Sequence, residues 1–182
     1  MGATTADLRA LVEEHHPATP REAAAKVRFL EEFARLPAPC DEHADPTHVT
    51  ASAIVVGPRG TVLHLHKRLG IWMQPGGHID GGETPPVAAR REATEELGLA
   101  VEHPVAGPQL LHLDVHEAAL GHTHLDLRYL LLAGDDDPHP PPGESPDARW
   151  CSWKEAMAIA DAALVDALPL ARAAYTANGG AA

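Results

Sequence analysis

The sequence predicts an α/β sandwich, in which a mixed β-sheet lies between helices, with an additional helical segment at the N-terminus. Two observations predict this fold class. Segments rich in β-branched residues occur both before and after a central helical stretch. Helix-start signals stand at Thr19, Thr84 and Ser152 and divide the chain into successive elements. With 182 residues, the chain is expected to form one domain with a small appendage.

Residues 1–46 are expected to form two helices and a linker outside the main domain. The first helix covers about residues 6–14, and Thr19-Pro20-Arg21-Glu22 is a capping box that opens a second helix to about Leu36. A polar linker that contains prolines follows over residues 37–46. Three roles are open for the two helices: they pack on the domain, cover a cleft as a lid or make the contact of a homodimer. We favour packing.

The main domain is expected to span residues 47–176, and residues 177–182 are expected to be a flexible tail. Pro169 is expected to kink or divide the last helix. The acidic, proline-rich stretch 135–147 has no periodicity and is expected to be a mobile loop. The expected strands cover residues 48–56, 61–67, 71–73, 100–103, 110–116, 122–132 and 148–151, and the expected helices cover residues 85–97, 153–160 and 163–175.

A glycine-rich loop leads into the central helix. Thr84 is a suitable N-cap, Pro85 is a suitable first helical residue, and Gly98 supplies the left-handed stop. The glycines before the helix allow positive φ angles and a close approach of the backbone to a ligand. These glycines are Gly76, Gly77, Gly81 and Gly82.

Three glutamates share one face of this helix, because Glu92, Glu95 and Glu96 are spaced at i, i+3 and i+4. Carboxylates this close repel one another, and a bound cation would relieve the repulsion. Mg²⁺ and Mn²⁺ prefer oxygen ligands, and Mg²⁺ favours sites that it shares with substrate phosphates. The helix is therefore predicted to hold Mg²⁺ or Mn²⁺ for phosphate chemistry. The alternative is a solvated acidic helix face.

Neighbouring residues agree with a metal-binding helix. Ala88 and Ala89 lie one turn before Glu92, and their small side chains are expected to leave room for ions and substrate. Arg91 lies four residues before Glu95 and can pair with it. Glu83 can reach the helix start, where negative charge is favourable.

These residues are part of a longer pattern. Gly77, five residues, Glu83, seven residues and then Arg91-Glu92-Ala93-Thr94-Glu95-Glu96-Leu97-Gly98-Leu99 resembles the Nudix box, G-x5-E-x7-R-E-U-x-E-E-x-G-U, with every fixed position filled. Strand-like segments extend the resemblance to about residues 48–172. The resemblance implies a Nudix-type α/β/α sandwich and a hydrolase that uses water and Mg²⁺ or Mn²⁺. Such enzymes cleave a nucleoside diphosphate linked to another group.

The resemblance also implies roles for individual residues. Glu95 and Glu96 would be the chief metal ligands, Glu92 a ligand or the general base, and the carbonyl of Gly76 a further ligand. Arg91 would orient the carboxylates, and Glu83 would support the loop. Many members take the general base from a later loop, for which the unranked candidates are Glu117, Asp135, Asp136 and Asp137.

Polar residues alternate along the strands expected at 110–116 and 122–132, and alternate residues share a face of a sheet. This polar face is either a solvent-facing side of the sheet or the wall of a substrate cleft. A dedicated transition-metal site among its histidines is the least favoured interpretation, because no HExxH or paired-cysteine spacing is present. The polar residues are His112, Asp114, His116, His122, His124, Asp126 and Arg128, with His64 and His66 on an earlier strand.

A cleft wall would offer Arg128, Asp126 and His124 to the substrate, and the loop backbone at Gly77 would approach it. Trp72 precedes the loop and is a candidate stacking platform for a base, with core packing as an equal alternative.

The sequence leaves the substrate open. In the family that the chain resembles, members acting on ADP-ribose tend to carry a proline about sixteen residues beyond the box, where this chain has Val115. Members acting on dinucleoside polyphosphates tend to carry a tyrosine slightly further on, where this chain has His116 and Glu117. Nucleoside triphosphates are therefore favoured. Two other classes are a non-catalytic nucleotide sensor with the same fold and an isopentenyl diphosphate isomerase, which would need a catalytic cysteine.

The chain is acidic, with 26 Asp and Glu against 14 Lys and Arg, and this charge disfavours binding to nucleic-acid polymers or anionic membranes. A small nucleotide or another diphosphate can still bind when metal ions supply positive charge. No apolar run is long enough to span a membrane and no secretion signal is present, so the cytoplasm is the expected location. Cys40 and Cys151 are expected to be buried thiols.

Overall fold

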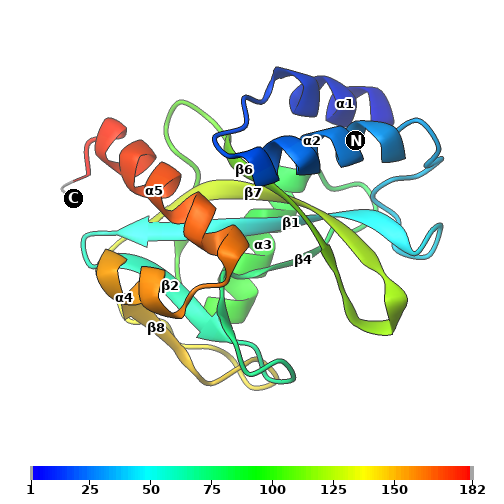
Figure 1. The fold of residues 1–182 in the computed structure, drawn as a ribbon. Helices are drawn as coiled ribbons and strands as arrows, with labels where there is room; N and C mark the ends of the chain where they lie inside the picture. The colour runs from blue at the N-terminus through cyan, green and yellow to red at the C-terminus, as the bar shows by residue number, and fades with distance from the viewer. Residues whose placement is uncertain (1, 181–182) are drawn as a thin grey trace.

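A mixed β-sheet forms the centre of the computed structural model, which describes residues 2–180 (Figure 1). Its strands are β1 (Thr47–Gly57), β2 (Gly60–Leu65), β3 (Trp72–Met73), β4 (Gly76–His78), β5 (Val101–Glu102), β6 (Gln109–Glu117), β7 (Thr123–Ala133) and β8 (Ala148–Cys151). The long strands β1 and β7 are parallel, with His48 opposite His124. The other pairs are antiparallel: β2 and β4 pair with β1, β5 and β6 pair with β7, and β3 and β8 pair with β2.

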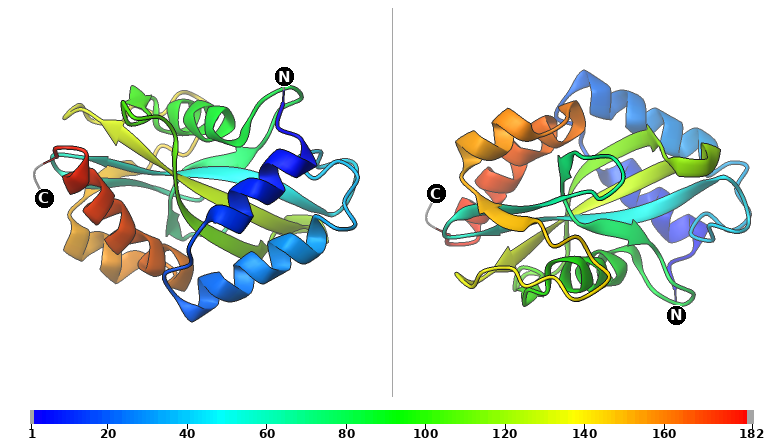
Figure 2. Two further views of the ribbon diagram at one scale, coloured as in Figure 1. Left: turned by 90° about the horizontal axis from the view of Figure 1, so that it is seen from above. Right: turned by 90° about the horizontal axis from the view of Figure 1, so that it is seen from below.

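Helices cover both faces of this sheet (Figures 1 and 2). α3 (Pro85–Leu97) lies behind the sheet in Figure 1, whereas α4 (Trp153–Ile159) and α5 (Ala162–Ala177) lie in front of it. Alternate residues of β1 supply the two cores: Val49, Ala51 and Ala53 face the core that contains α3, and Ile54 and Val56 face the core that contains α5. The predicted α/β sandwich with a mixed sheet is confirmed.

The N-terminal helices α1 (Thr5–Glu14) and α2 (Pro20–Glu32) pack against the domain, as favoured from the sequence. Leu8, Val12 and Phe29 are buried in the same core as α3. Glu22 is fully buried, and its carboxylate accepts hydrogen bonds from the N–H groups of Ala18 (2.6 Å) and of Leu113 in β6 (3.1 Å). This acidic side chain therefore joins α2 to the sheet.

Two predictions about the first half of the chain need correction. The Thr19 capping box is only half formed: Thr19 Oγ1 accepts the N–H of Glu22 at 3.2 Å, but the Glu22 carboxylate is used by Ala18 and Leu113. α2 ends at Glu32 rather than near Leu36, since the chain turns before Pro37 and a residue before proline disfavours helical geometry.

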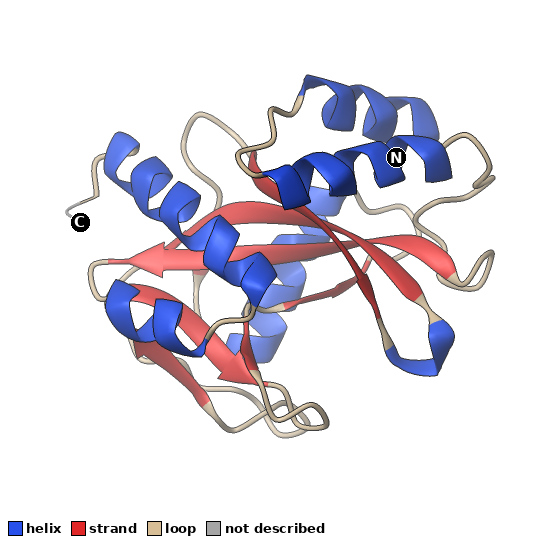
Figure 3. Ribbon diagram, in the orientation of Figure 1, coloured by secondary structure: helices blue, strands red, loops and turns tan. Residues whose placement is uncertain are grey.

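The later helices α3, α4 and α5 are drawn in blue in Figure 3. Their caps differ from one another. Thr84 is the N-cap residue of α3, but its side chain makes no capping hydrogen bond. The capping box of α4 is complete, because Ser152 accepts the N–H of Glu155 and the Glu155 carboxylate accepts the N–H of Ser152. Pro169 lies inside α5 without dividing it, and buried residues on both sides of Pro169 hold the helix against the sheet. Among residues 2–180, no helix is long and apolar enough to cross a membrane.

α5 ends at Ala177, one residue after residue 176, where the sequence places the end of the main domain. Residues 181–182 of the predicted flexible tail lie outside the described residues.

Candidate active site

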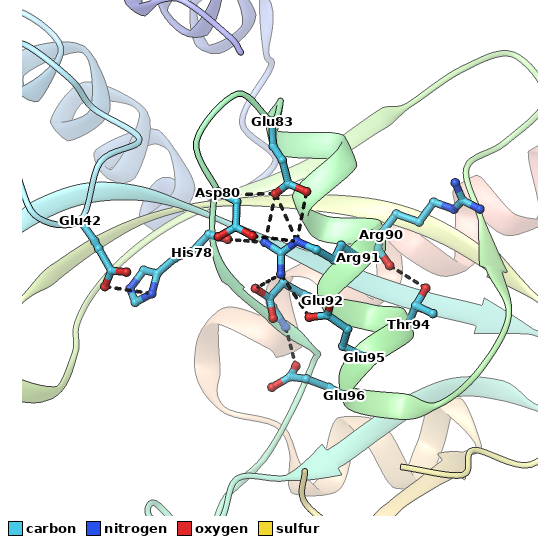
Figure 4. A network of polar contacts seen from close by, with 11 residues as sticks. Glu42, His78, Asp80, Glu83, Arg90, Arg91, Glu92, Thr94, Glu95 and Glu96 are labelled. Carbon is cyan, nitrogen blue, oxygen red and sulfur yellow. Dashed lines mark hydrogen bonds and ion pairs between the residues drawn. The ribbon is translucent and has the colours of Figure 1, made fainter. Parts of the chain in front are cut away.

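The apolar side of α3 determines where its carboxylates point. Ala88, Ala89, Ala93 and Leu97 are fully buried in the core. The expectation that Ala88 and Ala89 leave room for ions and substrate is therefore wrong, because both methyl groups pack in the core between α3 and the sheet. With this side against the sheet, the carboxylates on the neighbouring side of the helix face the glycine-rich loop (Figure 4).

Arg91 is the centre of the polar network between the loop and α3 (Figure 4). Its guanidinium group donates hydrogen bonds to Glu83 (3.1 Å), Glu92 (2.8 Å), Glu95 (3.2 Å) and the carbonyl oxygen of His78 (3.0 Å). The predicted contact between Arg91 and Glu95 is present. Hydrogen bonds from Arg91 also lower the pKa of Glu83. One arginine thus connects the loop to the carboxylate face of the helix.

Glu96 lies at the buried end of the carboxylate group and has little positive charge around it. Its Oε2 accepts the N–H of Gly76 at 2.9 Å, and Nε2 of His64 lies 3.8 Å away. Burial lowers the pKa of His64 to about 4, so this ring is neutral at pH 7. Burial and the charges of neighbouring carboxylates raise the pKa of Glu96 to about 7. A cation at this position would favour the ionised form.

Glu92 faces the backbone of β4 beside Glu96. A Cβ atom at Gly77 would lie 2.7 Å from Oε1 of Glu92, so a larger residue at this position would displace the Glu92 carboxylate. Burial raises the pKa of Glu92, and the hydrogen bond from Arg91 opposes this effect. Glu95 is different, because its side chain is 56% exposed. The structure therefore brings Glu92 and Glu96 together beside Gly76 and Gly77, with Glu95 on the solvent side.

Glu144 is a neighbour of the carboxylate group that the sequence did not single out. Its charge is close enough to Glu96 to contribute to the raised pKa of that carboxyl group. The loop that carries Glu144 is tied to α3 and β2: the N–H of His139 donates to the carbonyl of Leu97 (2.9 Å), and the Ser145 hydroxyl donates to the carbonyl of Leu65 (2.6 Å). An aperiodic acidic loop gives no sequence signal for which of its carboxylates returns to the helix.

The general-base candidates chosen from the sequence make other contacts. The Asp137 carboxylate pairs with Arg59 at 2.6 Å, and Glu117 accepts the hydroxyl of Thr123 at 3.1 Å. The carbonyls of Asp135 and Asp136 accept hydrogen bonds from Arg59 and Trp150. Within the described part of the chain, none of these four residues bonds to α3.

The polar face of β6 and β7 is buried in its central part, so its interpretation as a solvent-facing side is wrong. Asp126 and Arg128 are 3% and 2% exposed. Arg128 donates to Asp126 (3.0 Å) and Asp114 (2.9 Å), and Asp126 also accepts the hydroxyls of Thr50 (3.1 Å) and Ser52 (2.7 Å). Nη1 of Arg128 is buried without a partner among the described residues. The network is a rigid polar layer with one donor left free.

The charge of this layer is set by its own contacts. Burial acts to raise the pKa of Asp114, but the hydrogen bond with His116 and the charge of Arg128 lower it to about 2. Burial lowers the pKa of His124 to about 4, so His124 is neutral at pH 7.

Trp72 is half-buried and packs against the core that contains α4 and α5. The guanidinium group of Arg149 lies over its ring, 4.7 Å from the centroid. This contact covers one face of the indole and supports the packing alternative over a role as a base platform.

A surface pocket of about 640 Å³ opens between the N-terminal residues, the linker and the glycine-rich loop. Its lining includes His78 and Glu83 but none of the three carboxylates of α3. The pocket is therefore a neighbour of the carboxylate group rather than part of it. It is lined by residues 2–5, 37–43 and 78–83.

Known proteins share this fold and sequence pattern. The model of the NUDIX domain matches residues 46–172. A hydrolase of the NUDIX family from Clostridium perfringens is 29% identical, with a TM-score of 0.58 over 70% of this chain and 97% of that chain. A MutT NUDIX hydrolase from Burkholderia pseudomallei is 28% identical, with a TM-score of 0.56 over 68% of this chain and 97% of that chain. An Ap4A hydrolase from C. elegans, 23% identical, shares the fold, with a TM-score of 0.59 over 71% of this chain and 97% of that chain.

The fold and these matches define the class of the protein as a pyrophosphohydrolase, an enzyme that hydrolyses phosphoric anhydrides. The chain belongs to the Nudix family. The family and the class of enzyme predicted from the sequence are confirmed. The matched region begins at residue 46, so the two N-terminal helices lie outside it.

Proposed function

We propose that the chain hydrolyses the pyrophosphate linkage of a nucleotide-containing small molecule, with Mg²⁺ or Mn²⁺ held by the carboxylates of α3. The observation that supports this most directly is the position of Glu92 and Glu96, whose side chains are only 17% and 19% exposed and lie together beside Gly76 and Gly77. Burial without a compensating positive charge raises the pKa of Glu96 to about 7. A divalent cation supplies that charge, and the carboxylate oxygens of this group are the donors that hard ions prefer.

Glu92 and Glu96 would bind the ion from the buried side, and Glu95 would reach it by rotation of its exposed side chain. The carbonyl of Gly76 is a further candidate ligand. Arg91 keeps Glu92 and Glu95 in place through its hydrogen bonds, and Glu83 in turn holds Arg91. When bound, the metal neutralises the phosphate charge and favours attack by water at phosphorus.

We propose Glu144 as the residue that orients the attacking water and accepts its proton. The support is that Glu144 lies on a loop outside α3 and is near enough for its charge to raise the pKa of Glu96. The water oxygen forms the new bond to phosphorus, and the bridging oxygen leaves with the other phosphate group. Glu144→Gln should lower kcat strongly with little change in KM, whereas Asp137→Asn should leave kcat unchanged.

The favoured substrates are nucleoside triphosphates, and the name of the C. elegans relative adds dinucleoside polyphosphates as candidates. Asp126 and Arg128 are engaged with each other, so they support the polar layer. Nη1 of Arg128 is buried without a partner in the described structure, so a substrate carbonyl or phosphate would reach it only after the side chain moves. His124 lies on the same face of the sheet, two residues before Asp126.

A phosphate-release screen tests the proposal. Nucleoside triphosphates, dinucleoside polyphosphates and nucleotide sugars are incubated with the protein and Mg²⁺ or Mn²⁺. Glu96→Gln should lower kcat by orders of magnitude while the protein stays folded. Glu102→Gln is the matched control, since Glu102 is 70% exposed and pairs only with Arg90 in the described structure. A fully active Glu96→Gln variant would contradict the assignment. Tight nucleotide binding without metal-dependent turnover would favour a sensor.

A further inference from the structure

We propose that the chain has a second metal site, formed by His48, His122 and His124, which takes a borderline transition-metal ion such as Zn²⁺. One nitrogen atom from each ring lies within 4.8 Å of those of the other two rings. His48 and His124 lie at the beginnings of β1 and β7, which are side by side in Figure 1, and His122 immediately precedes β7. Spacing along the sequence does not reveal this site, because the parallel pairing of the two strands places His48 opposite His124.

The three rings form a compact group. The ring centroid of His48 is 5.0 Å from that of His124 and 5.2 Å from that of His122. In a tetrahedral zinc site, with Zn–N distances of about 2.0 Å, the ligand nitrogens lie about 3.3 Å apart. Small side-chain rotations would therefore close the group on one ion.

His48 provides the strongest reason to expect a ligand. Its ring is fully buried, and its Nδ1 lies 3.3 Å from the carbonyl oxygen of Asp45. A carbonyl oxygen can only accept a hydrogen bond, so Nδ1 carries the proton and Nε2 carries the lone pair. Nε2 is buried and has no partner among the described residues. A buried acceptor without a donor is unfavourable, and a metal ion in the group would satisfy it.

One further ring, that of His78, extends the group and is oriented by a carboxylate. Nδ1 of His78 lies 3.1 Å from Glu42, as Figure 4 shows, and the buried Nε2 of His78 has no partner in the described structure. The ring centroid of His78 is 5.0 Å from that of His48. A carboxylate on one ring nitrogen, with the other nitrogen free, is the usual arrangement of a metal-binding histidine. His78 is the candidate fourth ligand.

The donor types separate this site from the carboxylates of α3. Imidazole nitrogens favour Zn²⁺, Cu²⁺ and Ni²⁺, whereas Mg²⁺ and Mn²⁺ favour oxygen. His78 is the last residue of β4, and its carbonyl oxygen accepts a hydrogen bond from Arg91. An ion held by the histidines would therefore fix the end of the loop that supports the carboxylate face. The proposal stands independently of the substrate and of the metal at α3.

The test is a titration of the chelator-stripped full chain with Zn²⁺ in excess Mg²⁺, followed by isothermal calorimetry. We expect one Zn²⁺ per chain. The double variant His122→Ala/His124→Gln changes two half-buried rings and should weaken zinc binding about 100-fold. His16→Ala, at an exposed histidine, is the matched control and should bind as the wild type does. Glu96→Gln should also retain zinc binding, because its carboxylate belongs to the other site.

A second measurement identifies the ligands directly. Co²⁺ in place of Zn²⁺ should give the strong visible absorption of a four-coordinate site in the wild type and lose it in the double variant. Far-ultraviolet circular dichroism checks that the variants are folded, and the single variant His122→Gln serves if the double variant is not. The proposal fails if the wild type takes up no Zn²⁺ or if the folded histidine variant binds it equally well. It also fails if Glu96→Gln alone abolishes binding.

Discussion

Replacing Glu96 by Gln should stabilise the metal-free protein even though it removes activity. Burial raises the pKa of Glu96 from 4.5 to about 7, so ionising this group costs the folded state about 3 kcal/mol more than the unfolded state. The folded protein therefore binds the proton more tightly. Its stability falls as the pH rises from about 4.5 to about 7, and the full penalty applies at higher pH. Glutamine has the same shape without the charge, and its oxygen can still accept the N–H of Gly76.

The assay is urea unfolding in the presence of a chelator between pH 4 and pH 8. The free energy of unfolding of Glu96→Gln should equal that of the wild type at pH 4 and exceed it by up to about 3 kcal/mol at pH 8. Glu102→Gln, at a side chain that is 70% exposed, should change it by less than about 1 kcal/mol throughout. Added Mg²⁺ should stabilise the wild type more than Glu96→Gln, because a ligand that binds the folded state stabilises it.

Two results would refute this reasoning. If Glu96→Gln is no more stable than the wild type at pH 8, ionisation of Glu96 does not destabilise the folded state. A gain that stays constant from pH 4 to pH 8 would show that its source is not the charge.

Four further substitutions test the helix caps, the loop beside α3 and the buried polar layer. Ser152→Ala should lower the free energy of unfolding by about 1 kcal/mol, whereas Thr84→Ala should leave it unchanged, because the Ser152 side chain caps its helix and the Thr84 side chain does not. Equal effects of the two substitutions in urea unfolding would contradict this. Gly98→Ala should lower the melting temperature clearly, since Gly98 has φ 57° and a Cβ atom there would overlap the carbonyl oxygen of His139; an unchanged melting curve would argue against this loop position. Arg128→Met leaves two buried carboxylates unpaired and should cost about 3–5 kcal/mol in urea unfolding, so a loss below about 1 kcal/mol would contradict the buried network.

The sequence was sufficient for the family and for most of the elements, but it did not predict β4 or the end of α2 at Glu32. The strand predicted at 122–132 is observed at Thr123–Ala133, and the central helix has the predicted bounds Pro85–Leu97. Both predictions depend on local sequence patterns that do not require knowledge of distant contacts. These patterns are the alternating polarity of the strand and the helix-start and helix-stop residues Pro85 and Gly98. The contact of Arg91 with Glu95 was also predictable, because four residues along a helix return to the same face.

The remaining features depend on contacts between distant segments. The small side chains of Ala88 and Ala89 were expected to leave room for a metal ion, but both are buried because this side of α3 packs against the sheet. Polar alternation in β7 left a solvent-facing side of the sheet and the wall of a substrate cleft as alternatives, and Asp126 and Arg128 are in fact paired with each other and buried. The approach of Glu144 to Glu96 depends on how one aperiodic loop folds back. A single sequence carries no signal for such long-range pairings.

The two N-terminal helices also protect an edge of the sheet, because the carboxylate of Glu22 binds a backbone N–H group of β6. Among the described residues, β6 pairs only with β7, and its other side meets α2, where Glu22 takes the N–H of Leu113. In a chain trimmed to residues 46–172, the edge of β6 that contacts α2 would be exposed to solvent. The apolar surface that Phe29 covers would be exposed as well. Such a fragment is expected to associate with itself by strand addition, so expression of this enzyme should keep the first 45 residues.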